Sequence, residues 1–104
     1  MADGRFRVEF DDEAVADLKS PEMVKYVGAV RDEIERQLRH EPTKETRNRK
    51  RLAPNSTAEW EVRKPPLRIL YDVEEDERVV TIRAIVLKER ERTYRGGKEY
   101  DLHA

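Results

Sequence analysis

The chain of 104 residues is long enough for one domain with one modest core. Hydrophobic residues make up 37% of it and charged residues 43%, so an ordered fold has to come from the pattern of apolar residues rather than from their number. The formal net charge is −1, which excludes binding to nucleic acid through an overall positive charge. Residues 1–42 contain 7 Lys/Arg against 11 Asp/Glu, whereas residues 43–104 contain 15 against 12. The second half can therefore carry a local basic patch.

Several classes of protein are excluded at this stage. The chain has no cysteine, hence no disulfide, no cysteine-based zinc site and no thiol nucleophile. No apolar run approaches the roughly 20 residues that span a bilayer, and the first residues lack the apolar core of a signal peptide. His40 and His103 are isolated, so we expect no metal and no other cofactor. We expect one cytoplasmic domain, residues 1–104, that does not bind a membrane.

The first residues predict a strand followed by a short helix. Residues 5–10 alternate polar and apolar side chains, which is the pattern of a strand with one buried face. Asp11 and Asp12 then offer an N-cap, and apolar residues between 14 and 18 line a short helix. We expect the strand to lie beside the central strands of the sheet, parallel to one of them.

A longer helix follows. Residues 20–22, Ser-Pro-Glu, are typical of a helix start, with serine as the cap and proline in the first turn. Apolar residues at spacings of three and four continue to Leu38, which predicts an amphipathic helix of about five turns that covers the sheet. Pro42 ends it. Residues 43–57 lack periodicity and are rich in Lys and Arg, so they are either a solvated loop or a segment that follows a phosphate backbone.

The second half predicts three strands. Residues 58–63 and 67–73 alternate, and Pro65-Pro66 ends the first of them. Residues 78–87 form the last and longest strand, which is apolar on both faces, as a central strand is. Strict alternation places Val80, Ile82, Ala84 and Val86 on one face and Val79, Ile85 and Leu87 on the other. Trp60 and Tyr71 fall on buried-type positions, so we expect both in the core.

The chain then becomes strongly charged. Residues 88–95 read Lys-Glu-Arg-Glu-Arg-Thr-Tyr-Arg and predict a basic, tyrosine-bearing tail at the edge of the sheet, and Gly96-Gly97 breaks any structure after it. The predicted order is therefore strand, helix, helix and three strands. Elements segregated in this way indicate an α+β fold, with a small, mostly antiparallel sheet and an N-terminal helical hairpin packed on one face.

Three stretches carry a resemblance to a known family: residues 60–63 (Trp-Glu-Val-Arg), 67–73 (Leu-Arg-Ile-Leu-Tyr-Asp-Val) and 88–94 (Lys-Glu-Arg-Glu-Arg-Thr-Tyr). With the opening strand and the helical hairpin, the chain resembles the RelE/ParE superfamily of toxins from type II toxin–antitoxin systems over nearly its whole length. The resemblance implies a microbial-RNase-like fold and a cognate antitoxin partner. In the RelE-like branch it also implies metal-independent mRNA cleavage on the ribosome, which inhibits translation. It leaves a homodimer open.

The same resemblance implies roles for single residues. Arg68 matches the strand arginine that stabilises the scissile phosphate, and Tyr94 matches a tyrosine that takes part in proton transfer. Lys88 and Arg90 match basic residues at the end of the last strand. We therefore expect these four residues to be catalytic. Contacts to the RNA backbone are expected from Arg47, Arg49, Lys50, Arg51 and Arg95.

These residue types suit the chemistry. Cleaving RNA without a metal requires a base for the 2′-hydroxyl proton, a group that holds the charge developing on the phosphate, and an acid for the leaving 5′-oxygen. An arginine fork meets phosphate oxygens bidentately and stays charged. A cluster of cations lowers the pKa of a neighbouring tyrosine or lysine and so favours the form with one proton fewer.

Other roles for the same residues stay open. Arg68 can pair with Asp72 or Glu61 on the exposed face of the sheet, and Tyr94 can pack over the end of the sheet. Both roles would be structural.

Two other functions also stay open. One is a ParE-type inhibitor of DNA gyrase. The other is an inactive or solitary member of the family that binds only an antitoxin-like peptide, and it is favoured by Glu89 and Glu91, which stand among the basic residues.

Overall fold

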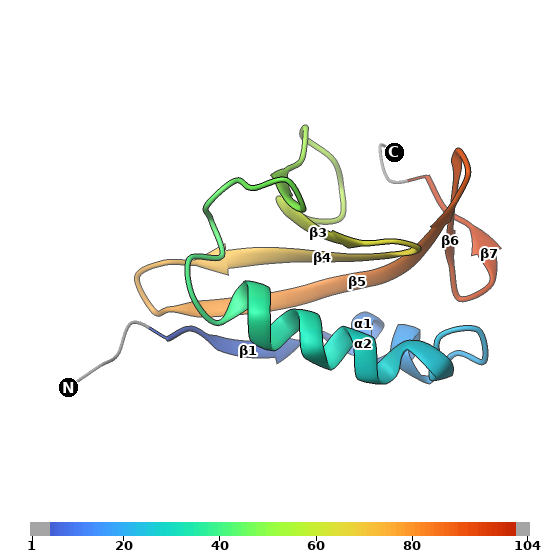
Figure 1. Cartoon of the computed structure of the whole chain (residues 1–104), viewed down its shortest axis with the longest axis horizontal. Helices are drawn as coiled ribbons and strands as arrows, with labels where there is room; N and C mark the ends of the chain where they lie inside the picture. Colours follow the sequence, from blue (N-terminus) through green and yellow to red (C-terminus); the bar gives the residue numbers. More distant parts are fainter. Residues whose placement is uncertain (1–4, 102–104) are drawn as a thin grey trace.

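The computed structural model describes residues 5–101, which form one seven-stranded sheet with helices packed on one face (Figure 1). The predicted α+β class, with a mostly antiparallel sheet, is confirmed. The elements are β1 (Arg7–Phe10), α1 (Asp12–Lys19), η1 (Val24–Tyr26), α2 (Val27–Glu33), η2 (Ile34–Leu38), β2 (Arg49–Arg51), β3 (Trp60–Lys64), β4 (Leu67–Glu74), β5 (Val79–Glu89), β6 (Arg92–Arg95) and β7 (Lys98–Glu99). Within residues 5–101, no helix is long and apolar enough to cross a membrane.

Strand β5 is the centre of the sheet. It pairs antiparallel with β4 along one edge, and two strands share its other edge: β1 runs parallel to its first half, and β6 runs antiparallel to its last residues. The remaining strands follow in the order β2-β3-β4-β5-β6-β7. The predicted central position of the longest strand, and the predicted parallel pairing of the first strand with a central one, are both confirmed.

The two faces of the sheet have different environments. The main core lies between the sheet and the helices, and it contains Trp60 and Tyr71 as predicted, at 5% and 0% exposure. The Tyr71 hydroxyl donates to the carbonyl of Pro42. The opposite face, which we call the open face, carries a smaller apolar cluster of Ala58, Leu70, Ala84 and Val86, with Leu52 and Tyr100 packed against it.

The predicted faces of β5 are wrong beyond Ile82, because a β-bulge interrupts the alternation. Leu70 pairs with Ala84 whereas Tyr71 pairs with Ile82, so Arg83 has no opposite residue on β4. The extra residue moves Ala84 and Val86 to the open face, and it moves the apolar residues at 85 and 87 to the helical face, beside those at 80 and 82.

The helices begin and end differently from the prediction. Asp11 caps α1 as expected, and its carboxylate accepts from the backbone N–H of Ala14. Ser20 does not start the second helix; it ends α1, and its hydroxyl donates to the carbonyl of Asp17. A turn separates it from a helical run, residues 24–38, that starts with a 3₁₀ turn and ends with a π-helical turn.

Three short strands were not predicted. Residues 49–51, inside the segment read as a loop, form β2 beside β3. All three are cationic, so they show no alternation that could indicate a strand. Residues 88–95 are not a tail: Lys88 and Glu89 end β5, and residues 92–95 form β6. Gly96-Gly97 is a turn to β7 rather than a break, and both glycines have positive φ, as two-residue hairpin turns favour.

A pair of charged side chains fills the gap between β1 and β6 on the edge of β5. Asp17, on α1, accepts a hydrogen bond of 3.0 Å from the backbone N–H of Ile85. The same carboxylate accepts a hydrogen bond of 3.0 Å from Nε of Arg95, and Nη2 of this arginine donates to the carbonyl of Arg83. Burial alone would lower the pKa of Arg95, but the hydrogen bond and charge of Asp17 outweigh it and raise the pKa. The pair replaces the missing ladder hydrogen bonds and attaches α1 to the last hairpin.

We therefore expect Asp17→Ala to lower the free energy of unfolding by about 3 kcal/mol, because it leaves the buried N–H of Ile85 without its acceptor and removes the carboxylate that lies 3.0 Å from Nε of the half-buried Arg95. Urea denaturation measures this change. Asp32→Ala, which removes an exposed aspartate from α2, is the matched control and should change it by less than about 0.5 kcal/mol. Equal effects of the two substitutions would contradict this role of Asp17.

Candidate functional site

The register of β3, β4 and β5 brings Arg68 and Lys88 to the same side of the sheet. Arg68 pairs with Val86, which lies on the open face, and Lys88 follows Val86 by two residues on the same strand. Directly opposite residues and residues two apart share a face. The Pro65-Pro66 turn also places Arg63 directly opposite Arg68. Arg63, Arg68 and Lys88 therefore project from three neighbouring strands on the open face.

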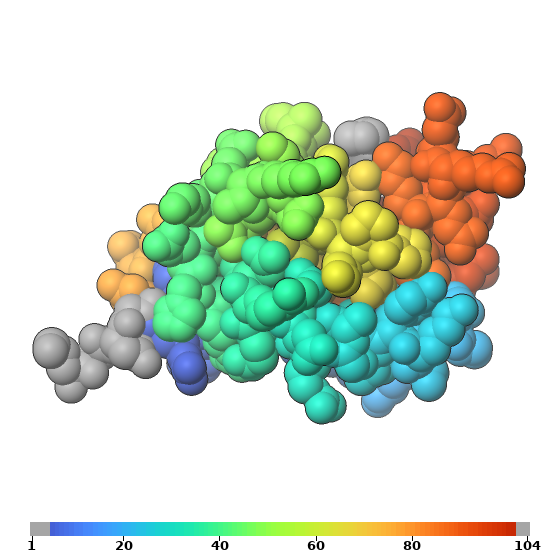
Figure 2. All heavy atoms as spheres, viewed as in Figure 1, coloured from blue at the N-terminus to red at the C-terminus, as the bar shows by residue number. Residues whose placement is uncertain are grey.

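These cations meet in a small depression at the end of the β3–β4 hairpin. Its volume is about 200 Å³, and it is lined by Arg63, Pro65, Pro66, Leu67, Arg68, Lys88 and Arg90. Figure 2 shows the yellow segment of β3 and β4 at the surface, between the helices and the orange end of the chain that carries the β5–β6 turn. We call this site the cationic depression, because all four of its charged lining residues are basic.

A second, larger depression adjoins it and shares Arg68 and Lys88. Its volume is about 540 Å³, and we call it the mixed depression because carboxylates line it together with cations. Its remaining lining residues are Glu91, Arg92, Thr93, Glu99, Tyr100 and Asp101. The site thus offers a purely cationic part for an anion and a neighbouring part with aromatic, hydroxyl and acidic groups.

Of the two partners expected for Arg68, Glu61 is the one the structure shows. The carboxylate of Glu61 is 0% exposed and lies 3.4 Å from Nη1 of Arg68. Asp72 instead accepts from the backbone N–H of Glu59 and pairs with Arg83. Burial lowers the pKa of the Arg68 guanidinium, and the charge of Glu61 partly opposes this shift. An arginine stays protonated in proteins, so Arg68 is a fixed positive charge held at one place on a strand.

Tyr94 is not brought together with Arg68. It pairs with Leu87, whose side chain belongs to the helical core, so the register puts it on the opposite face. The depression beside it is lined by residues 89–92 and lacks Arg68 and Lys88. The tyrosine that lines the mixed depression is Tyr100.

Tyr100 is held in place by several contacts. Its backbone N–H donates to the carbonyl of Thr93, and its hydroxyl is hydrogen-bonded to the hydroxyl of Thr57. The guanidinium of Arg95 lies 5.4 Å from the ring centroid, and Arg95 does not line the mixed depression. The ring also packs against the apolar cluster of the open face. Its orientation is therefore fixed by the fold.

Arg49 has a structural role: its guanidinium is hydrogen-bonded within the fold. It is 6% exposed, and its Nε donates to the carbonyl of Lys44 at 2.6 Å. Its Nη1 donates to the carbonyl of Gln37 at 2.7 Å and to the side-chain oxygen of Gln37 at 3.2 Å. A cation at the C-terminal end of a helix satisfies the last carbonyls and is favoured by the helix dipole.

The other basic residues of this segment lie at three different places. Arg47 is exposed. Lys50 pairs with Glu61 in the β2–β3 register and so lies on the open face, but it lines neither the cationic nor the mixed depression. The guanidinium of Arg51 lies 5.7 Å from the centroid of the Trp60 ring.

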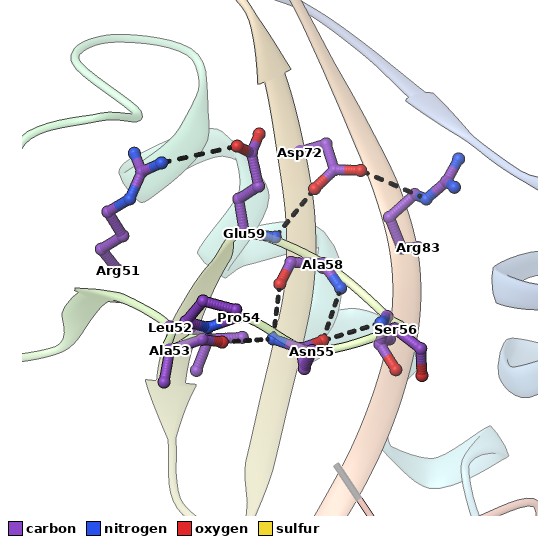
Figure 3. A pocket seen from close by; sticks show the side chains of 11 residues that line it. Arg51, Leu52, Ala53, Pro54, Asn55, Ser56, Ala58, Glu59, Asp72 and Arg83 are labelled. Atoms are coloured by element: carbon purple, nitrogen blue, oxygen red, sulfur yellow. Dashed lines mark hydrogen bonds and ion pairs between the residues drawn. The ribbon is translucent and has the colours of Figure 1, made fainter. Parts of the chain in front are cut away.

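A further depression lies under the loop that joins β2 to β3 (Figure 3). Its volume is about 410 Å³, and its cations are already paired within it: Arg51 with Glu59, and Arg83 with Asp72. Asn55 organises the loop through hydrogen bonds to the backbone of residues 53–58. The two cations and two carboxylates of this lining balance each other, whereas the cationic depression keeps an excess of positive charge even when the buried Glu61 is counted. Within residues 5–101, no group of three or more His, Asp or Glu side chains is placed to hold a metal ion.

The sequence interpretation missed two residues of the site, Arg63 and Tyr100, and it named Glu61 only as a structural partner of Arg68. A signal was present for Arg63. A two-residue turn at Pro65-Pro66 fixes the register, and it pairs Arg63 with Arg68. No comparable signal indicated Tyr100, because its position depends on a hairpin that was read as a break.

Comparisons with known proteins identify no relative of this chain. No family model, no curated protein and no solved structure matches the chain. The structure therefore defines a small α+β domain with a basic site on the open face of its sheet, and its function has to be argued from that site.

The structural role of Arg49 can be separated from a role in binding. We expect Arg49→Ala to lower the free energy of unfolding by about 3 kcal/mol, because the substitution removes a buried charged donor to three oxygens. Arg47→Ala, at an exposed position on the same segment, should change it by less than about 0.5 kcal/mol. Thermal or urea unfolding of both variants measures this difference, and a stable Arg49→Ala variant would contradict it.

Proposed function

We propose that this protein is a toxin that binds single-stranded RNA on the open face of its sheet and cleaves mRNA on the ribosome. The observation that carries the proposal is the cationic depression. Four basic side chains from β3, β4, β5 and the following turn line it, and among residues 5–101 no acidic side chain does. The resemblance to RelE-like toxins supports the reaction, and the place of Arg68 among the cations of this depression supports the role assigned to it.

Arg68 would hold the scissile phosphate. It projects from a strand paired on both sides and is fixed by Glu61, so its guanidinium is oriented before the substrate arrives. Preorganised donors of this kind stabilise the charge that develops during phosphate cleavage. Lys88 lies on the next strand, half-buried, and adds a second donor to the same phosphate.

In the proposed reaction the 2′-oxygen attacks phosphorus, the bond from phosphorus to the 5′-oxygen breaks, and a 2′,3′-cyclic phosphate forms. The 2′-hydroxyl proton passes to a base, and the 5′-oxygen receives a proton from an acid. The carboxylates of Glu91 and Glu99 line the mixed depression and can accept a proton, and the ammonium of Lys88 can donate one. Groups of the ribosome would complete this set.

The bases next to the scissile phosphate would enter the mixed depression. Aromatic side chains bind single-stranded nucleic acid by stacking with bases that are not paired. The fixed ring of Tyr100 supports this role, and the acidic groups around it offer acceptors for the amino groups of a base.

A second candidate is a family member that binds RNA or a peptide but does not cleave. The position of Tyr94 on the face opposite Arg68 favours it, because the tyrosine expected to transfer a proton is then remote from the phosphate.

A neutralising antitoxin is part of the proposed function. An apolar depression of about 240 Å³ between β1 and the helices supports a protein partner, since six of its lining residues are apolar: Val8, Phe10, Leu18, Val27, Val30 and Ile34. An amphipathic segment of a partner would fit such a surface.

The activity is tested by adding the purified protein to a cell-free translation reaction and mapping the 5′ ends of the message. We expect new ends within the translated region. Arg68→Lys, which keeps the charge beside Glu61 but removes the fork, should reduce cleavage by about 10²-fold. Absence of new ends while the protein binds RNA would favour the second candidate, and absence of both would contradict the proposed function.

Removal of single cations should weaken RNA binding in a salt-dependent way. We expect Lys88→Gln and Arg90→Gln each to lower the affinity for a single-stranded RNA of ten nucleotides. The slope of log affinity against log salt should fall in magnitude by about 0.7 for each phosphate that the variant no longer neutralises. Fluorescence anisotropy at several salt concentrations measures this slope. Lys25→Gln, on the helical side at η1, is the control and should leave the slope unchanged.

The two tyrosines should differ in their effect on RNA binding. We expect Tyr100→Leu to weaken binding about 10-fold, because a stacked base is worth roughly 1–3 kcal/mol, whereas Tyr100→Phe keeps the ring and should have a smaller effect. Tyr94→Leu should leave the affinity within about twofold, because the register puts it on the other face. The same anisotropy titration compares the three variants. A larger decrease in affinity for Tyr94→Leu than for Tyr100→Leu would show that the RNA does not lie on the open face.

A further inference from the structure

Glu61 is a fully buried carboxylate in a position that alternation would expose. It lies on the open face, between the cationic residues, and its side chain is 0% exposed. Glutamate is almost never fully buried unless it is paired. One oxygen, Oε1, lies 2.6 Å from Nε of Arg63, and the other, Oε2, lies 3.4 Å from Nη1 of Arg68. A single carboxylate therefore binds two arginines through its two oxygens.

The two arginines need such a partner. Arg63 and Arg68 stand directly opposite each other on adjacent strands, and like charges in that arrangement repel. The negative charge of Glu61 offsets this repulsion, and its contacts hold both guanidiniums near one carboxylate. Arg63 remains 43% exposed and Arg68 15%, so both still border the solvent. Within the part of the chain that the structure describes, the contacts to Glu61 occupy one nitrogen of each guanidinium and leave other N–H groups as donors.

We propose that Arg63 and Arg68 form a two-arginine clamp for one phosphate group, and that Glu61 is the positioning residue that holds the clamp. The inference rests on the proposed function and deepens it, because it assigns Arg63 as a further residue that binds the RNA phosphate. The clamp faces the cationic depression, where Lys88 and Arg90 add charge without a carboxylate in the lining. Paired guanidinium forks suit phosphate oxygens, since each can donate two parallel hydrogen bonds.

The direction in which one substitution changes RNA affinity distinguishes a positioning role of Glu61 from a purely electrostatic one. Glu61→Gln removes a negative charge from beneath an anion site, so electrostatics alone predicts tighter RNA binding. If Glu61 holds the clamp, the same substitution releases two arginines that repel each other, and binding weakens. Glu89→Gln is the matched control, because it removes an exposed carboxylate near the same site but contacts neither arginine.

The first experiment is an anisotropy titration with single-stranded RNA. We expect Glu61→Gln to weaken binding about 10-fold and Arg63→Lys, which keeps the charge but removes the fork, to weaken it by a similar factor, whereas Glu89→Gln should bind as tightly as the wild type or more tightly. Tighter or unchanged binding in Glu61→Gln would overturn the proposal.

A second experiment uses the wild-type protein and so does not depend on the folding of a variant. Inorganic pyrophosphate is titrated into ¹⁵N-labelled protein, and the Nε–H signals of the arginines are followed by NMR. We expect saturable shifts of the Arg63 and Arg68 signals. Absence of these shifts overturns the clamp even if RNA binds elsewhere. Shifts with pyrophosphate but no binding of RNA would keep the clamp and contradict the proposed function.

Discussion

The contact on which the rest of the site depends is the bridge between Asp17 and Arg95 at the edge of β5. The central strand has β1 on the first part of this edge and β6 on the last, and no strand formed by residues 5–101 covers the residues between them. The carboxylate of Asp17 accepts a hydrogen bond from the N–H of Ile85, and Arg95 donates one to the carbonyl of Arg83. Because Arg95 belongs to the last hairpin, the bridge also holds Tyr100 and its neighbours against the open face.

The register of the paired strands positions the basic residues of the site. The short turn at Pro65-Pro66 sets Arg63 opposite Arg68, and the pairing of β4 with β5 sets Lys88 beside them. Arg63 and Arg68 are close in sequence, on either side of this turn, whereas Lys88 belongs to the next strand, and all three lie at the same end of the sheet. A strand that is paired on both sides is a rigid support, so the side-chain charges that it carries are fixed in place before a ligand binds. A buried glutamate at the centre of the cluster shows that the fold tolerates a desolvated ion to keep them in place.

Much of the fold could be predicted from the sequence, because alternation and helical spacing are local signals. The central strand, the parallel first strand and the burial of Trp60 and Tyr71 followed from them. The bulge at Arg83 could not be predicted, since residues 84–87 are all apolar and show no alternation that would reveal the change of face. The roles of single cations were harder still. Arg49 and Arg95 look like the other basic residues in the sequence, but their partners come from distant segments and draw their guanidiniums into contacts within the fold.

The proposed function makes one central claim, that RNA lies across the open face and not on the helical face. The most direct measurement is the perturbation of backbone amide NMR signals during titration with a single-stranded RNA. The largest shifts should fall on Arg63, Arg68, Lys88, Thr93 and Tyr100, with little change in α2. Shifts confined to the helices and β1, or no shifts at an excess of RNA, would contradict this claim.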